Sequence, residues 1–137
     1  MKIFYTYIIR CKNDTLYTGY TTDIKRRMLE HTDGINCKYT KNYGFKKLEA
    51  YFESSSRSSA MKLEAYIKKM TRANKLKVIE NPNALVEMFL NDKGEQIRVG
   101  SMSVDIINNE VYELKKGIDW KQSIINKNYY LELHERL

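Results

Sequence analysis

The chain has 137 residues, and its 24 Lys and Arg against 17 Asp and Glu give a net charge of +7 at neutral pH. This length supports one hydrophobic core, which excludes two domains of normal size. No apolar run approaches the roughly 20 residues of a membrane helix, and the N-terminus lacks a signal-peptide pattern, so we expect a soluble, cytoplasmic protein.

The positive charge is concentrated in the first 80 residues. They contain 17 Lys and Arg and 8 Asp and Glu, a net charge of +9, whereas residues 81–137 contain 7 and 9, a net charge of −2. Eight of the eleven tyrosines also lie in the first 80 residues. Cations interleaved with aromatic rings favour a partner with phosphates and bases. The alternative is a basic surface that only maintains solubility.

The two cysteines, Cys11 and Cys37, are isolated from one another and from other metal-binding side chains in the sequence. Neither lies in the Cys-x-x-Cys or Cys-x-x-x-His spacing that chelates zinc. We therefore expect two reduced thiols and no structural metal.

The first predicted element is a β-hairpin. Ile3 to Arg10 and Leu16 to Tyr20 are rich in β-branched and aromatic residues, and residues 12–14 have turn chemistry. Tyr17 shares a face with Tyr7 only if an odd number of residues connects the paired strands, or if one strand carries a bulge. Because side chains alternate, one face of the first strand is predicted to carry Tyr5, Tyr7 and Ile9, and the other Phe4, Thr6 and Ile8.

A helix is predicted next, with Thr22 as its N-cap and Gly34 at its end. Its repeating face consists of Ile24, Arg27, Met28 and His31. Arg27 and His31 therefore occupy positions where an amphipathic helix normally carries apolar residues. The alternative for Arg27 is a side chain at the edge of the apolar stripe with its charge in solvent.

A second helix carries the acidic residue of greatest interest. A basic loop is predicted over residues 34–47, a strand from Leu48 to Phe52, and this helix from a cap at Ser58 or Ser59 to about Met70. Its repeating face consists of Ala60, Leu63, Glu64 and Ile67. A buried, unpaired carboxylate costs several kcal/mol, so Glu64 needs a cation, either a metal ion or Lys68 one turn on.

The rest of the chain is predicted to be a small appendage. Pro82 marks a boundary, so we assign residues 1–82 to the main domain and residues 83–137 to a β-rich extension. Its predicted elements are an apolar segment from Ala84 to Leu90, a turn at residues 91–94, strands at residues 96–99, 102–107 and 110–114, and a helix capped by Asp119 that contains Trp120, Ile124 and Ile125. This extension is expected to pack on the domain, to set substrate choice or to mediate self-association.

An ordered set of motifs in residues 2 to about 80 resembles the GIY-YIG nuclease superfamily, and within it the small stand-alone branch of bacteria and viruses. The order and spacing of the motifs are more specific than either tyrosine triplet alone. The matching segments are Tyr5-Thr6-Tyr7, Tyr17-Thr18-Gly19, Thr21-Thr22-Asp23, Arg27, His31, Lys38-Tyr39-Thr40 and the helix from Ser58 to Lys68 with Glu64.

The resemblance implies an α/β (α+β) fold with three antiparallel strands flanked by helices, and DNA cleavage with one Mg²⁺ or Mn²⁺ ion. By motif position it implies Tyr7 and Tyr17 as the paired catalytic tyrosines, Arg27 as the phosphate-binding residue and Glu64 as the metal ligand. His31 stands where many members carry a histidine.

Two features depart from the family pattern. Tyr5 replaces the first glycine, and Thr6 and Thr18 occupy the middle of the two triplets, which the small branch tolerates. Members often use a late asparagine as well, and neither Asn74 nor Asn81 aligns with it convincingly.

The chemistry of phosphodiester hydrolysis needs a deprotonated water and positive charge on the transition state. Arg27 offers a planar, permanently charged fork, and Glu64 can hold a hard divalent cation. A phenol with its ordinary pKa of about 10 costs roughly 4 kcal/mol to ionise at neutral pH. We therefore hypothesise that a cation lowers the pKa of Tyr7 or Tyr17, which accepts the proton, while the other orients water or phosphate. The alternative is that both phenols only pack.

Binding to DNA is expected to use cations and backbone near these residues. Lysines of the 34–47 loop are predicted to line the path of the strand, although a solvated charged loop is the alternative. Gly19 allows either backbone approach to phosphate or a bulge, or it is a turn glycine. The predicted nucleic-acid contacts are Gly19, Arg26, Arg27, Lys38, Tyr39 and Lys41.

The sequence thus predicts a metal-dependent DNA endonuclease or nickase. The alternative is a nucleic-acid-binding module on the same fold that performs no chemistry. The enzyme is favoured because a binding module has no need of a carboxylate that faces phosphate. Repair, restriction, mobile-element and viral roles all stay open, as does the oligomeric state.

Overall fold

A computed structural model describes residues 2–116 of the chain. The helix predicted at Asp119 lies outside the described residues. Four strands are present in that range: β1 (Phe4–Cys11), β2 (Leu16–Thr21), β3 (Phe45–Ser54) and β4 (Arg98–Val99). They form one antiparallel sheet in the order β2-β1-β3-β4. The expected mixed fold with an antiparallel sheet is confirmed, but the sheet has four strands rather than three, because β4 pairs with the edge of β3.

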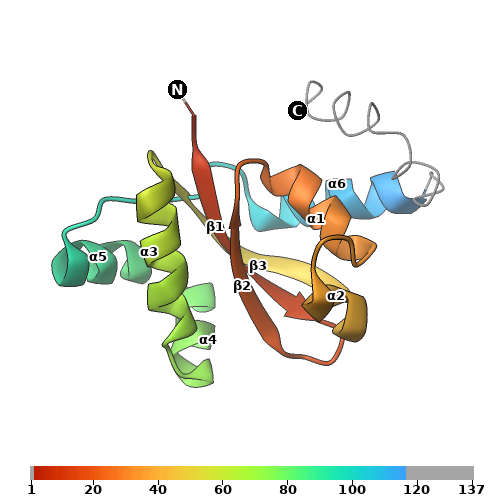
Figure 1. The fold of residues 1–137 in the computed structure, drawn as a ribbon, viewed down its shortest axis with the longest axis horizontal. Helices are drawn as coiled ribbons and strands as arrows, with labels where there is room; N and C mark the ends of the chain where they lie inside the picture. The colour runs from red at the N-terminus through yellow and green to blue at the C-terminus, as the bar shows by residue number, and fades with distance from the viewer. Residues whose placement is uncertain (1, 117–137) are drawn as a thin grey trace.

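Helices cover both faces of the sheet (Figure 1). The described helices are α1 (Ile24–Thr32), α2 (Lys38–Tyr43), α3 (Arg57–Lys68), α4 (Arg72–Glu80), α5 (Pro82–Lys93) and α6 (Val104–Lys116). In Figure 1, α1, α2 and α6 lie on one side of the sheet, and α3, α4 and α5 lie on the other. Within the described residues, no helix is long and apolar enough to cross a membrane.

The register of the hairpin places both motif tyrosines on one face. Tyr7 lies opposite Gly19, and Tyr17 lies opposite Ile9. The last pair is Arg10 with Leu16, so residues 11–15 connect the paired positions. This connection has an odd number of residues, which is the condition predicted above for Tyr7 and Tyr17 to share a face.

The alternation predicted for β1 is confirmed by two separate core clusters. Tyr7 and Ile9 belong to the cluster under α1 and α6, which includes Met28 and Ile107. Ile8 belongs to the cluster under α3, α4 and α5. Because each face of β1 is buried, a register slip of one residue would move a polar or oversized side chain into each cluster.

The helix starts differ from the predicted caps by one to three residues. Asp23, not Thr22, caps α1 by accepting from the Arg26 N–H at 3.1 Å. Ser56, not Ser58 or Ser59, caps α3. Each stretch offers several side chains able to cap, and only the backbone geometry selects one. The predicted basic loop also contains the short helix α2, and β3 begins at Phe45, before Leu48.

The β-rich prediction for the second part of the chain is wrong over most of the described residues, and only the strand predicted at residues 96–99 is present in part, as β4. Residues 102–107 and 110–114, predicted as strands, fall largely within α6, whose Ile107 and Val111 are buried one turn apart. Their β-branched content suggested strands, but packing on α1 and β3 selects a helix. Pro82 lies in the first turn of α5, where its missing N–H costs nothing. The boundary at residue 82 stays a prediction, and described residues beyond it contribute to both core clusters.

Candidate active site

Tyr7 is the central residue of a buried polar chain between β1 and α1. Its side chain is 1% exposed. The Nε–H of Arg27 donates to the Tyr7 hydroxyl oxygen at 3.3 Å, and the same oxygen lies 2.7 Å from Nε2 of His31. The Tyr7 hydroxyl is therefore contacted by two side chains that lie one turn apart on α1. The sequence prediction that these two residues face the interior of the protein is confirmed.

His31 is buried and neutral in this arrangement. Burial, and then the neighbouring charge of Arg27, lowers its pKa to about 3. Because Arg27 supplies a proton to the Tyr7 oxygen, the consistent assignment has Tyr7 donating to Nε2 and Nδ1–H donating to Thr40 Oγ1 at 3.1 Å. Thr40 in turn donates to the Cys37 carbonyl at 3.4 Å. Each hydrogen bond from Arg27 to the Cys37 carbonyl thus has a defined donor and a defined acceptor.

The free energy of unfolding is expected to depend on pH through His31. Its pKa is near 6.5 in an unfolded chain and about 3 in the fold, so the unfolded state binds more protons between these values. The contribution of His31 is therefore complete above pH 6.5 and decreases by up to about 1.4 kcal/mol per pH unit as the pH falls. Urea unfolding at pH 7 and pH 5 measures this decrease. His31→Gln should be less stable at pH 7 and should show a smaller loss at pH 5; an equal loss in both proteins would contradict the assignment.

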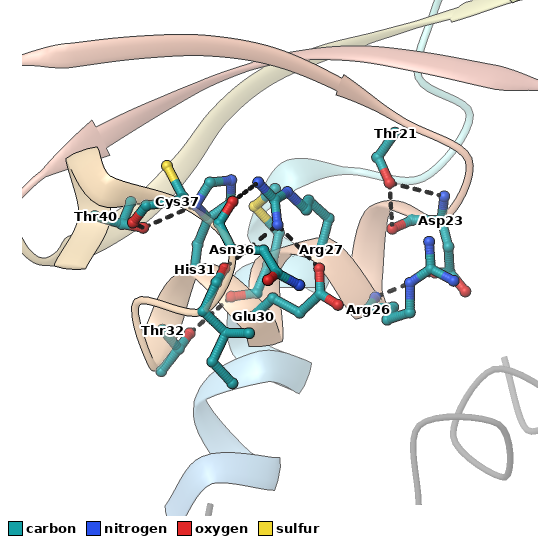
Figure 2. Close-up of polar contacts among 12 residues, drawn as sticks. Thr21, Asp23, Arg26, Arg27, Glu30, His31, Thr32, Asn36, Cys37 and Thr40 are labelled. Atoms are coloured by element: carbon teal, nitrogen blue, oxygen red, sulfur yellow. Dashed lines mark hydrogen bonds and ion pairs between the residues drawn. The ribbon is translucent and has the colours of Figure 1, made fainter. Parts of the chain in front are cut away.

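Arg27 is held by several acceptors besides Tyr7. Its Nη1 donates to Glu30 at 3.0 Å and to the Ile35 carbonyl at 3.5 Å, and Nη2 donates to the Asn36 carbonyl at 3.2 Å. Figure 2 shows Arg27 turned toward His31 and Asn36. The side chain is 16% exposed, so the alternative of a solvated arginine at the edge of the helix is wrong. Of the five N–H donors of a guanidinium, these bonds leave one for a ligand.

Tyr17 lies beside the same histidine but reaches solvent. It is half-buried on β2, with its ring 5.8 Å from His31 and 5.3 Å from Tyr39. Burial, and then the Cys37 group, raises the pKa of Tyr17 to about 12.

No Lys or Arg among the described residues lowers the pKa of Tyr7 or Tyr17 below its ordinary value, so that part of the hypothesis is wrong. Burial raises the pKa of Tyr7 well above its ordinary value as well. The positive charge of Arg27 acts in the opposite direction on both phenols, and burial outweighs it. Both hydroxyls are therefore protonated at neutral pH in this arrangement.

Glu64 lies on α3, the helix that packs against β1 and β2. Its side chain is 23% exposed and forms an ion pair with Lys68 at 3.4 Å, so the surface partner considered from the sequence is present. The Glu64 carboxylate also contributes to the raised pKa of Tyr17, which places its charge within electrostatic range of that phenol. The charges of Glu64 and Arg27 thus both act on Tyr17, although the three residues come from separate elements.

Comparison with known proteins identifies the family. A model described as the GIY-YIG catalytic domain matches residues 3–77. The chain belongs to the GIY-YIG family. A UPF0213 protein of Staphylococcus haemolyticus is 45% identical over 76 residues, which cover 56% of this chain and 93% of that protein. A UPF0213 protein of Lactococcus lactis is 41% identical over 91 residues, which cover 66% of this chain and 92% of that protein.

One solved structure is also similar. The solution NMR structure of a UPF0213 protein from Bacillus halodurans has 36% sequence identity, covers 61% of this chain and 92% of that chain, and superimposes with a TM-score of 0.38. Membership of this nuclease family implies that the chain binds nucleic acid.

Gly19 has a structural role that the GIY-YIG motif alone does not explain. It lies within β2, opposite Tyr7, and the β1–β2 pairing has no register shift there, so neither the turn nor the bulge is present. A Cβ atom at this position would lie 2.6 Å from the Tyr7 hydroxyl oxygen and 3.3 Å from the ring of Tyr17. The second triplet therefore ends in glycine because the phenol of the first triplet crosses over it.

The donor set around Glu64 fits only a loosely held GIY-YIG metal ion. In residues 2–116, no group of three or more His, Cys, Asp or Glu side chains is placed to bind a metal. A single carboxylate leaves most coordination positions to water and phosphate. Mg²⁺ keeps several waters and takes oxygen ligands, so Glu64 fits such an ion if the substrate supplies the remaining oxygen atoms.

The remaining predicted nucleic-acid contacts divide into two groups. Lys38 and Lys41 are exposed on α2, and Tyr39 packs on Tyr17 while donating to Thr15 at 2.7 Å. Arg26 lies instead beside Thr22 and Asp23, away from His31 and Thr40 (Figure 2).

Three contacts of the site were not predicted from the sequence. Glu30 holds Arg27, Cys37 contributes to the raised pKa of Tyr17, and Thr40 completes the partners of His31. The only sequence signal for them is the spacing of Glu30 three residues after Arg27, which suits an ion pair on a helix. The other two are brought in by α2, which was predicted as a loop.

Proposed function

We propose that the protein is a DNA endonuclease or nickase that depends on one divalent metal ion and hydrolyses phosphodiester bonds. The observation that carries the proposal is the position of Arg27, 3.3 Å from the Tyr7 hydroxyl, with the Tyr17 ring 5.8 Å from the His31 that contacts the same hydroxyl, in a chain of the GIY-YIG family. The charges of Arg27 and Glu64 both act on the pKa of Tyr17. A cation donor, an acid and a solvent-accessible phenol are the groups that phosphodiester hydrolysis requires.

Arg27 is proposed to bind the scissile phosphate. Its guanidinium is fixed by Tyr7 and Glu30, which removes most of the rotamer freedom that an exposed arginine loses on binding. The remaining N–H and the permanent charge are directed at a non-bridging oxygen, where charge increases in the transition state. Tyr7 and His31 in this scheme position Arg27 and do not contact DNA.

Tyr17 is proposed as the phenol nearest the attacking water. Tyr7 is 1% exposed and its hydroxyl already has two partners, whereas Tyr17 is half-buried and lies in the field of Glu64. Tyr17 is neutral in the described arrangement. With positive charge held at Glu64, which would offset the carboxylate that raises its pKa, Tyr17 would become the phenolate and accept a proton from the water whose oxygen forms the new bond to phosphorus, while the bond to the leaving oxygen breaks. A Mg²⁺ or Mn²⁺ ion bound at Glu64 would supply positive charge to the phosphate and to the attacking water.

Cleavage of DNA by the full chain tests this function. Supercoiled plasmid, flapped duplex and single-stranded DNA are incubated with Mg²⁺ or Mn²⁺, and products are resolved by electrophoresis. Wild type should cut at least one substrate, and Arg27→Ala should reduce the rate by about 10²–10³-fold, the loss typical of one transition-state donor.

Two outcomes would overturn the proposal. Equal cutting by wild type and Arg27→Ala would remove the proposed site. If the chain binds DNA but cuts no substrate with either metal, it is a nucleic-acid-binding module without catalytic activity.

A further inference from the structure

A groove lies on the side of the sheet opposite Tyr7. Helices α3, α4 and α5 enclose it, and its volume is about 940 Å³. Figure 1 shows these three helices grouped on one side of the sheet, with α1 and α2 on the other. None of the residues proposed to act on phosphate lines this groove.

Lysines surround the groove. Lys62, Lys69, Lys77 and Lys93 line it, against one acidic side chain, Asp92. Lys62 lies 3.6 Å from Glu95, whereas Lys69, Lys77 and Lys93 form no ion pair with any described residue. The Asp92 carboxylate accepts a hydrogen bond from Tyr66, so part of its negative charge is engaged within the protein. The groove thus carries excess positive charge, which suits an anionic ligand.

The lining between these lysines is largely apolar. It includes Ala65, Met70, Val78, Ala84 and Met88. Met88 is 43% exposed although it is a large apolar side chain. A duplex keeps its bases stacked inside and would present only phosphates to such a surface. Unpaired bases expose their faces, so a groove with cationic edges and an apolar floor suits a single strand.

The groove and Glu64 are on opposite flanks of the same helix. Lys62, Ala65, Tyr66 and Lys69 repeat at helical spacing and face the groove. Glu64 is two residues from both Lys62 and Tyr66, which puts it about half a turn away from the groove-facing side of α3. A helix is about 10 Å across, so a strand that leaves Glu64 and crosses α3 reaches the groove within a few nucleotides.

We propose that the groove formed by α3, α4 and α5 binds the unpaired nucleotides of single-stranded DNA adjacent to the scissile phosphate. The lysines contact phosphates, and bases lie on the apolar floor. This inference rests on the proposed function, and it specifies the substrate class as DNA with an unpaired strand.

Binding of oligo-dT to the full chain without divalent metal tests the groove separately from catalysis. The probe is a fluorescent strand of about 12 nucleotides, within the range of known single-strand sites. The double variant Lys69→Glu with Lys77→Glu should weaken binding at least about tenfold, and the slope of log K against log salt should fall by about 1.4. Lys115→Glu with Lys116→Glu makes the same change of charge on α6 and should alter affinity by less than about threefold.

The apolar floor is tested by filling it and by removing the bases. Ala84→Trp occupies the groove without changing charge and should weaken oligo-dT binding while leaving binding of an abasic strand of the same length unchanged. Equal affinity of wild type for oligo-dT and the abasic strand would overturn the inference, as would equal losses in the two lysine pairs. Tighter binding of poly-Glu than of oligo-dT would assign the groove to an acidic protein segment instead.

Failure of the groove and failure of the nuclease are distinguishable. If plasmid is cut but the Lys69 and Lys77 variant binds oligo-dT like wild type, the groove inference fails alone. If no substrate is cut and that variant loses oligo-dT binding, the proposed function fails and the groove stands as a single-strand site.

Discussion

Replacement of Glu64 by glutamine is expected to lower kcat/KM for DNA cleavage by about 10²–10³-fold, the range for loss of one electrostatic partner of the transition state. Glutamine keeps the size of the side chain but removes the charge that would hold a divalent cation. The fold should be retained, because the Lys68 pair at 3.4 Å is partly exposed and such pairs contribute about 0–1 kcal/mol. Initial rates with Mn²⁺ and Mg²⁺, measured against ion concentration, check the effect.

The control for Glu64→Gln is Glu80→Gln. Glu80 is exposed at the end of α4 and forms no ion pair with a described residue, so this variant makes the same change of charge without touching the site. It should cut DNA within about twofold of wild type. DNA affinity in the absence of metal should not fall in Glu64→Gln, since the variant loses a negative charge. Cleavage at the wild-type rate by Glu64→Gln would remove Glu64 from the proposed mechanism.

Substitution of Gly19 by alanine is expected to damage both stability and activity, although it adds only one methyl group. The new Cβ would lie 2.6 Å from the Tyr7 hydroxyl oxygen and 2.8 Å from its Cζ, far inside normal contact distance. Tyr7 cannot yield freely, because His31 and Arg27 hold its hydroxyl from two sides. The free energy of unfolding should fall by about 1–3 kcal/mol, as for overpacked cores, and cleavage should fall with it because Arg27 loses its support.

A double-mutant cycle separates this contact from a general effect of alanine in a strand. In the Tyr7→Phe background the nearest atom is absent, so Gly19→Ala should cost less in urea unfolding than it does in wild type. Gly94 serves as a second comparison, because its Cβ would meet nothing within 4 Å and only its φ of +66° is unfavourable. Gly94→Ala should cost about 1–2 kcal/mol through its backbone conformation alone and should leave cleavage unchanged. An unaltered stability of Gly19→Ala would contradict the proposed packing.

Short-range pattern predicted most of the elements that carry the site. Alternation along β1 placed Tyr7 and Ile9 on the same face, and helical spacing placed Arg27 and His31 toward the interior. Such signals depend only on the periodicity of the backbone, which is the same in every strand and in every α-helix. They failed for α6, whose β-branched residues suggested strands, because the choice there depends on packing against α1 and β3.

The sequence by itself determined which side chains are available for chemistry: two phenols, a guanidinium and an acid in the order of the GIY-YIG motifs, on elements of the right type. The tertiary structure alone decided how they differ. It buried Tyr7 between Arg27 and His31 with its phenol over Gly19, and it left Tyr17 half-buried, where the charge of Glu64 acts on its pKa. Burial, register and pKa depend on contacts between residues distant in the chain, and no local spacing encodes the distance between β1, α1 and α3.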